Sequence, residues 1–244
     1  MSKKYISTEA IRNFRNSLKE LLLAHDSIGK YRTFVFLVKD KVKIKNRKIS
    51  QSLEEILSKE SEGFLANLIF VNLVTIMEVY LKECLFEALR RDPKLVRRFL
   101  EKYKMERRIS VDDLYVGANA FAFSLLNDIV FHNLKKVDAL YKIVFNFSIL
   151  ELGDYKNLEK CVKIRHNIVH ENSQVDGKKM EFKYSGILGA AKVILNFVEG
   201  IDYFIRHRKK RKKFTSIFSL YSGVTTSLAE WDEYLKAKYI ISVK

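Results

Sequence analysis

Six consecutive residues, Arg165 to His170, combine side chains that can act together on a phosphodiester. Arg165 carries a planar guanidinium that stays charged at any working pH and fits a phosphate through two parallel hydrogen bonds. His170 carries an imidazole, whose unperturbed pKa is close enough to neutrality for proton transfer. A group that stabilises charge and a group that moves a proton are complementary, so this hexapeptide is the candidate catalytic site.

The hexapeptide lies in an apolar pattern that predicts a helix over residues 154–171. The apolar stripe consists of Leu158, Cys161, Val162, Ile164, Ile168 and Val169, and Asp154 is a candidate N-cap. On an ideal helix Arg165 and His170 lie about 140° apart, so one helix does not easily direct both at one phosphate. Three solutions stay open: a distorted helix end, a long Arg165 side chain that swings round, or a second copy of the site across a two-fold axis.

Two further polar residues, His166 and Asn167, lie between Arg165 and His170. His166 and His170 are four residues apart and share one helix face, which would suit a zinc ion, but only Glu171 follows as a third ligand. We therefore expect no metal and no other cofactor.

A purely structural interpretation of the hexapeptide also stays open. In that case Arg165 pairs with a core carboxylate such as Glu78, and His170 is a satisfied buried imidazole. The remaining histidines, His25, His132 and His207, are expected at structural or surface positions.

The composition favours a helical protein with a polyanionic partner. The chain of 244 residues has one proline, nine glycines and 48% hydrophobic residues, which is a poor supply of turn residues for a large sheet. We therefore expect an all-α protein. Lysine and arginine outnumber aspartate and glutamate by 45 to 29, giving a formal net charge of +16 that suits nucleic acid or acidic lipid. Cys84 and Cys161 lack the paired spacing of a zinc site, so free thiols are expected.

One apolar stretch, residues 64–81, is close to the length that spans a bilayer. Asn67, Asn72, Thr75 and Glu78 interrupt it, and an uncompensated glutamate is costly in lipid. We therefore expect the core helix of a soluble bundle and no membrane partner. Residues 1–9 are polar and contain no apolar signal core, which predicts a cytoplasmic location.

Apolar periodicity and capping signals predict a series of helices. The first begins at Ser7 or Thr8 and ends near Gly29, and residues 31–48 fit either a hairpin or a helical continuation. A short helix is expected from Ser50 or Ser52 to residue 59. The core helix follows over residues 62–90, and further helices over 94–104, from Ser110, and over 114–127, 135–146, 154–171 and 184–208. Residues 172–178 are expected to form a loop.

A strongly basic run follows the last of these helices. It consists of Arg206, His207, Arg208, Lys209, Lys210, Arg211, Lys212 and Lys213. Its seven cations could bind a phosphate backbone, since each neutralised phosphate releases a counterion. A solvated helix end, favoured by the negative C-terminal dipole, explains the same run equally well. The tail that follows carries enough apolar residues to pack back on the body.

The hexapeptide resembles the Arg-x-x-x-x-His signature of HEPN-domain ribonucleases, a superfamily of all-α proteins. Arg165 and His170 occupy the signature positions, and polar His166 follows the arginine as in that family. The context is similar to that of the larger HEPN proteins: an acid, Glu78, embedded in a hydrophobic helix, the segment Phe131, His132, Asn133 and Leu134, and a loop with Asn172 and Gly177.

The resemblance covers about residues 60–205, as one HEPN-like core within a single helical domain of residues 1–244. Residues 1–59 would then be an N-terminal extension packed on this core, and residues 206–244 a basic strip with a C-terminal helical tail. Some toxins of the family carry a tyrosine two residues after the histidine that a partner enzyme modifies. Asn172 stands there in this chain, so that regulation is not carried over.

The resemblance implies metal-independent endoribonuclease activity by paired domains that form a composite cleft, typical of toxins and anti-phage abortive-infection effectors. His170 would move a proton at the ribose 2′-OH or the leaving 5′-oxygen, and Arg165 would stabilise the charged phosphorane. His166, Asn167 and Glu78 would be auxiliary, and an antitoxin or sensor protein would restrain the enzyme. The alternative is a non-catalytic helical module that binds nucleic acid or protein.

Overall fold

The computed structural model describes residues 8–41, 59–103, 117–152, 155–170, 174–175, 178–179 and 184–206 of the chain. Within these residues the protein is helical apart from one short pair of strands, which agrees with the expected all-α class. The elements are α1 (Thr8–Lys41), α3 (Lys59–Arg91), α4 (Pro93–Lys102), α6 (Ala118–Asn127), α7 (Leu134–Phe145), the 3-10 turn η1 (Ile149–Glu151), α8 (Tyr155–His170), β1 (Gln174–Val175), β2 (Lys178–Lys179) and α9 (Tyr184–Arg206).

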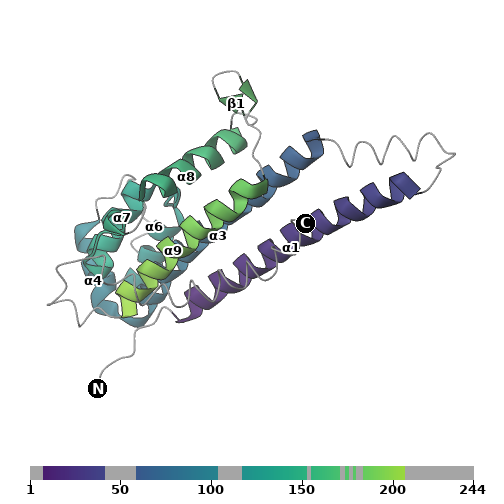
Figure 1. Cartoon of the computed structure of the whole chain (residues 1–244). Coiled ribbons are helices and arrows are strands. Elements are labelled where there is room, and N and C mark those ends of the chain that lie inside the picture. The colour runs from purple at the N-terminus through teal and green to yellow at the C-terminus, as the bar shows by residue number, and fades with distance from the viewer. Residues whose placement is uncertain are drawn as a thin grey trace.

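Helix α3 is the central element of the fold. It contacts α1, α4, α6, α7, α8 and α9. Figure 1 shows α1, α3 and α9 running alongside one another along the long axis, with α8 next to them and α4, α6 and α7 grouped at one end. A residue of α3 can therefore meet side chains from several other helices.

The hydrophobic core extends from α3 into α1. Phe14 and Leu18 of α1 are buried in the same cluster as Phe70, Leu73 and Tyr80 of α3. The rings of Phe14 and Tyr80 lie 5.7 Å apart between centroids and meet edge to face at 61°, a favourable aromatic arrangement. The first helix thus contributes to the same core as the helices that follow.

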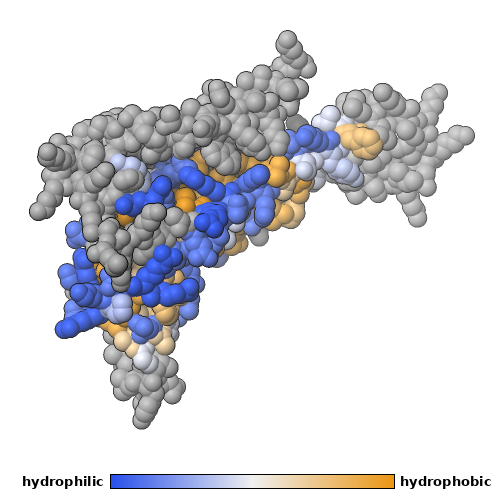
Figure 2. All heavy atoms as spheres, turned by 90° about the horizontal axis from the view of Figure 1, so that it is seen from below, coloured by the Kyte–Doolittle hydropathy of each residue, from blue (hydrophilic) through white to orange (hydrophobic). Residues whose placement is uncertain are grey.

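The segment Ser61–Arg91 of α3 is long and apolar enough to cross a membrane by length and composition. In the structure its buried residues pack against other helices, and Glu78 lies in a polar cluster rather than on an apolar surface. Both features are those of a bundle's core helix. Figure 2 shows hydrophilic side chains over much of the described part of one face, with hydrophobic atoms exposed between them.

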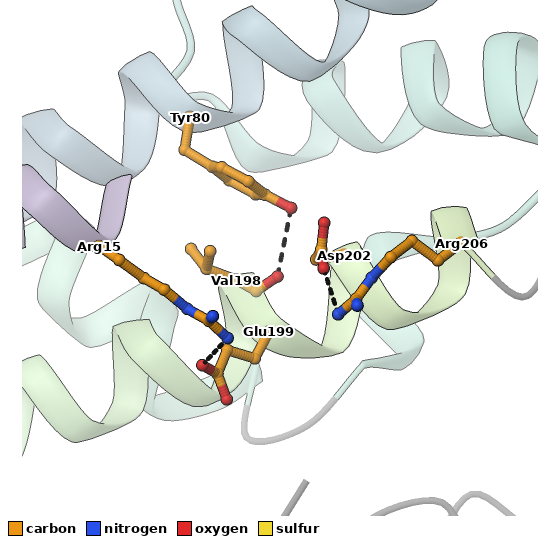
Figure 3. Close-up of polar contacts among 6 residues, drawn as sticks. All are labelled: Arg15, Tyr80, Val198, Glu199, Asp202 and Arg206. Atoms are coloured by element: carbon orange, nitrogen blue, oxygen red, sulfur yellow. Dashed lines mark hydrogen bonds and ion pairs between the residues drawn. The ribbon is translucent and has the colours of Figure 1, made fainter. Parts of the chain in front are cut away.

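A layer of polar contacts joins α1, α3 and α9 (Figure 3). Arg15 Nη2 lies 2.7 Å from Glu199 Oε1, and the Tyr80 hydroxyl donates to the Val198 carbonyl at 3.3 Å. Farther along α9, Arg206 Nη2 lies 2.5 Å from Oδ2 of Asp202, whose side chain is 1% exposed. The first two contacts join α1 and α3 to α9, whereas the pair of Asp202 and Arg206 lies within α9 and neutralises a buried charge.

Several helix boundaries agree with the sequence predictions to within a few residues, namely those of α3, α4, α7, α8 and α9. The start of α4 shows the physical reason. Asp92 accepts a hydrogen bond from the Lys94 backbone N–H at 3.0 Å, and Pro93 occupies the first turn, where its missing N–H costs nothing.

Two local predictions were wrong. The first helix does not end near Gly29 but continues to Lys41, because no proline or capping residue stops it and a glycine in an exposed helix costs only about 1 kcal/mol. The segment after α8 is not only a loop, since β1 and β2 pair antiparallel within it. The helices expected to start at residues 50–52 and at Ser110, and the tail, lie outside the described residues.

Candidate active site

A buried carboxylate in the first half of α7 binds the turn that precedes α8, the helix that carries the hexapeptide. Asp138 is 4% exposed, and its Oδ1 accepts from the Ser148 hydroxyl at 2.7 Å and from the backbone N–H groups of Ile149 and Leu150 at 2.8 and 3.3 Å. These bonds hold η1 against α7. The start of α8 follows four residues after η1, so the corner helps to position α8.

Helix α8 is anchored by the predicted apolar stripe, except that Val169, which was expected to belong to it, is exposed. Leu158 and Cys161 are buried, and α8 contacts both α3 and α9. This docking turns Arg165 toward α3, where its side chain is 17% exposed, whereas His170 lies at the exposed surface. The two signature residues therefore face different directions, as the helix geometry requires.

Glu78 of α3 meets Arg165 across the interface between α3 and α8. The distance from Arg165 Nε to Glu78 Oε1 is 4.0 Å, and both side chains are largely buried. At that distance the contact is electrostatic, and neither atom has a hydrogen-bond partner among the described residues. The expected contact between Glu78 and Arg165 is present, but it is loose, so the guanidinium keeps donors for another anion.

His132 approaches the same glutamate oxygen from the loop between α6 and α7. Its Nδ1 lies 3.9 Å from Glu78 Oε1, and its side chain is 33% exposed. The loop is held on both sides: Phe131 is 6% exposed in the core, and Asn133 caps α7 by accepting from the Lys136 N–H at 3.2 Å. The His132 carbonyl also accepts from the Leu134 N–H at 3.0 Å.

The other two imidazoles lie together on the exposed side of α8. The ring centroids of His166 and His170 are 4.6 Å apart with the planes tilted by 44°. Because four residues make slightly more than one helical turn, these rings occupy neighbouring places on one face. Both residues are exposed, so both are accessible to a large substrate.

The pKa values of Glu78 and His132 are shifted by partial burial and by the positive charges around them. Burial raises the pKa of the Glu78 carboxyl, and Arg165 partly opposes this. Burial also lowers the pKa of His132, and the positive charges of Arg165, His166 and His170 lower it further. His132 is therefore within electrostatic range of all three α8 residues, and together with Glu78 these residues form the five-residue cluster of the candidate site.

The auxiliary and RNA-binding residues expected from the sequence differ in burial, and only some of them are among the described residues. Asn167 is only 9% exposed, so it can orient neighbouring groups but is not presented to solvent like His166. Arg206, the first cation of the basic run, contacts the buried carboxylate of Asp202. The other cations of the run, Arg208, Lys209, Lys210, Arg211, Lys212 and Lys213, lie outside the described residues.

No group of three or more His, Cys, Asp or Glu side chains in the described part of the chain is arranged to hold a metal ion. The rings of His166 and His170 contact one another at a tilt, and Glu171, the third ligand considered from the sequence, is not among the described residues.

His132 is the member of the cluster that the sequence prediction assigned to a structural or surface position. It lies 33 residues before Arg165 and in a turn, where helical periodicity gives no information about the direction of a side chain. One feature of the sequence could have indicated that His132 is held in place: it lies between a large apolar residue and an asparagine that could cap α7.

Comparison with known proteins gives no relative from which a function could be carried over. No protein-family model, no curated protein and no solved structure matches this chain significantly.

Proposed function

We propose that this protein is a metal-independent endoribonuclease of the HEPN type. The observation that supports this proposal best is the gathering of Arg165, Glu78 and three imidazoles from three separate segments. A charged donor beside partly buried groups whose pKa values are shifted, here Glu78 and His132, is typical of catalytic sites. The net charge of +16 suits RNA as the substrate.

The proposed reaction uses the ribose as the internal nucleophile. The 2′-oxygen attacks the adjacent phosphorus while the bond from phosphorus to the 5′-oxygen breaks, leaving a 2′,3′-cyclic phosphate and a 5′-hydroxyl. Arg165 donates hydrogen bonds to the phosphorane oxygens, where negative charge develops. His170 transfers a proton, and Glu78 helps to hold Arg165. DNA lacks the 2′-hydroxyl and is not cleaved.

We further propose that two copies of the chain form the catalytic unit. Three exposed valines, Val79, Val130 and Val169, are 45% to 49% exposed, and each lies within two residues of a member of the cluster. Exposed apolar side chains next to site residues in the sequence support a contact with another protein there. A two-fold dimer through this surface would bring two clusters close together.

The exposed side of α8 offers a path for the RNA backbone. Lys156, Lys160 and Lys163 are all exposed and lie on the helical face that leads to His166 and His170. A row of cations supports binding to phosphates without selecting a sequence. The same row supports the second candidate function, a nucleic-acid-binding module that does not cleave.

The proposed activity also suggests a biological role. We propose a cytoplasmic toxin or anti-phage abortive-infection effector, because an unrestrained ribonuclease would harm its own cell. Such an enzyme needs a restraining antitoxin or sensor protein.

The proposed activity is tested by incubating bulk transfer and messenger RNA with purified protein in EDTA. We expect the wild type to cleave RNA but not DNA, and Arg165→Ala and His170→Ala to lose at least about a hundredfold in rate while binding RNA. A wild type that binds RNA and never cleaves it would favour the binding module. Cleavage that persists in His170→Ala would exclude this mechanism.

A further inference from the structure

We infer that His132 is a second catalytic imidazole of this site and acts as the general base on the ribose 2′-hydroxyl, which leaves His170 to act as the general acid. This inference rests on the proposed ribonuclease function and deepens it. The hexapeptide supplies one signature imidazole, whereas internal attack requires one proton to be removed from the 2′-oxygen and another delivered to the 5′-oxygen.

The position of His132 is fixed relative to the charge-stabilising group. His132 Nδ1 at 3.9 Å and Arg165 Nε at 4.0 Å both approach one oxygen, Oε1 of Glu78. A phosphate held by the outer nitrogens of Arg165 would therefore lie next to the imidazole. With 33% of its side chain exposed, His132 is accessible to a substrate and still shielded from bulk water on its inner side.

The orientation of the ring suits a base. Nδ1 is the nitrogen nearest Glu78, so a proton on Nδ1 would be directed toward a carboxylate oxygen that has no hydrogen-bond partner among the described residues. Placing the proton there leaves the lone pair on Nε2, on the opposite side of the ring. Glu78 then selects the tautomer that can accept a proton, as a carboxylate does beside other catalytic imidazoles.

The charges around His132 favour its neutral form. The titratable and charged groups that face it are Glu78 of α3 and, from α8, Arg165, His166 and His170. Burial and then the α8 charges lower the pKa of His132 below its ordinary value of 6.5, so the imidazole is free to accept a proton at neutral pH. His170 is exposed at the end of α8, where it is accessible to a substrate.

The step balances in atoms and charge. The proton of the 2′-hydroxyl moves to Nε2 of His132 as the bond from the 2′-oxygen to phosphorus forms. The bond from phosphorus to the 5′-oxygen breaks as His170 gives its proton to that oxygen. The products are the cyclic phosphate, the 5′-hydroxyl, a protonated His132 and a neutral His170.

The first test is the pH dependence of RNA cleavage by the wild type, His132→Gln and, as a matched control, His25→Gln at a histidine of α1 outside the cluster. We expect kcat/KM of the wild type to fall on the acidic side as the base becomes protonated, at a pH below the 6.5 of an ordinary histidine because the pKa of His132 is lowered. His132→Gln should lose about 10²–10⁴-fold in rate and lose this acidic limb, with RNA affinity within a few-fold of the wild type. An acidic limb that survives in His132→Gln would overturn the assignment.

The second test separates base from acid with an RNA whose scissile 5′-oxygen is replaced by sulfur. A thiolate leaves without protonation, so this substrate bypasses the need for a general acid. We expect it to restore His170→Ala to near the wild-type rate and to leave His132→Gln slow. Restoration of His132→Gln instead would reverse the two roles and contradict the inference.

The two proposals fail in distinguishable ways. If the wild type does not cleave RNA in EDTA, the ribonuclease function itself is wrong. If the wild type cleaves and His132→Gln cleaves equally fast, only the role of His132 is wrong.

Discussion

At the scale of single residues, one oxygen atom organises the candidate site. Glu78 Oε1 has a guanidinium on one side and an imidazole on the other, at 4.0 and 3.9 Å, and forms a hydrogen bond with neither. Catalytic contacts are often long in a free enzyme and tighten when substrate binds. The loose geometry is therefore compatible with a site that closes around a phosphate.

We expect Glu78→Gln to separate catalysis from binding. Glutamine keeps the size of the side chain but removes the charge that holds Arg165 and orients His132, so kcat should fall by about tenfold or more. RNA affinity should not weaken, because a negative charge has been removed from a phosphate site. Steady-state cleavage and equilibrium binding measure the two quantities, and an unchanged kcat would show that Glu78 has no part in the reaction.

A second residue-scale prediction concerns the pH dependence of stability. Burial raises the pKa of Asp202 from its ordinary value of 3.8 to about 6, against the opposing effects of Arg206 and Arg15. Between these values the folded protein retains a proton that the unfolded chain has lost, so Asp202 makes the protein less stable as the pH rises from about 4 to 6.

Asp202→Asn should remove this loss. As the pH rises from 4 to 7, the difference in free energy of unfolding between Asp202→Asn and the wild type should grow by about 1–3 kcal/mol in favour of the variant. Urea denaturation at several pH values measures the difference. Parallel curves for the two proteins would show that the carboxyl titrates alike in the folded and unfolded chains.

At the scale of elements, the corner from α7 through η1 to α8 positions the hexapeptide. Asp138→Ala removes the acceptor of three hydrogen bonds and leaves buried donors unsatisfied, so we expect a loss of about 3 kcal/mol in the free energy of unfolding. Asp138→Asn keeps the Oδ1 acceptor and should cost clearly less, since the ion pair it loses involves the exposed Lys142. Equal losses would show that the negative charge matters more than the accepted hydrogen bonds.

The lysine row on α8 gives a prediction about binding. Changing Lys156, Lys160 and Lys163 to glutamine should weaken RNA binding and reduce the magnitude of the slope of log affinity against log salt, since fewer counterions are released. Lys19, Lys94 and Lys102, which are exposed on α1 and α4, provide a control of equal charge change. Equal losses for both triple variants would mean that only net charge matters.

The sequence predicted the helices well where apolar periodicity and capping residues agree, as for α4 and α7. It failed where a helix lacks a stop signal, so that α1 continues past Gly29. At the candidate site, the spacing predicted that Arg165 and His170 lie on different sides of the helix, and in the structure Arg165 is largely buried and His170 is exposed. The position of His132 depends on the packing of a turn against two helices, which no local pattern encodes.

At the scale of the whole molecule, dimerisation is the central expectation. If Arg165 and His170 act from different copies, mixing the inactive Arg165→Ala and His170→Ala proteins should restore about a quarter of the wild-type sites, because half of the dimers are mixed and each has one intact site. Val169→Lys should place a charge in the proposed contact surface and prevent both dimer formation and this restoration. A dimer measured by sedimentation without restored activity would place both groups in one chain.

The most direct test of the ribonuclease proposal is the chemistry of the RNA ends that the wild type produces in EDTA. Mass spectrometry should find 2′,3′-cyclic phosphates paired with 5′-hydroxyls, since the ribose itself is the nucleophile and no metal-activated water takes part. Fragments that end in a 3′-hydroxyl and a 5′-phosphate, or intact RNA bound to the protein, would contradict the proposal.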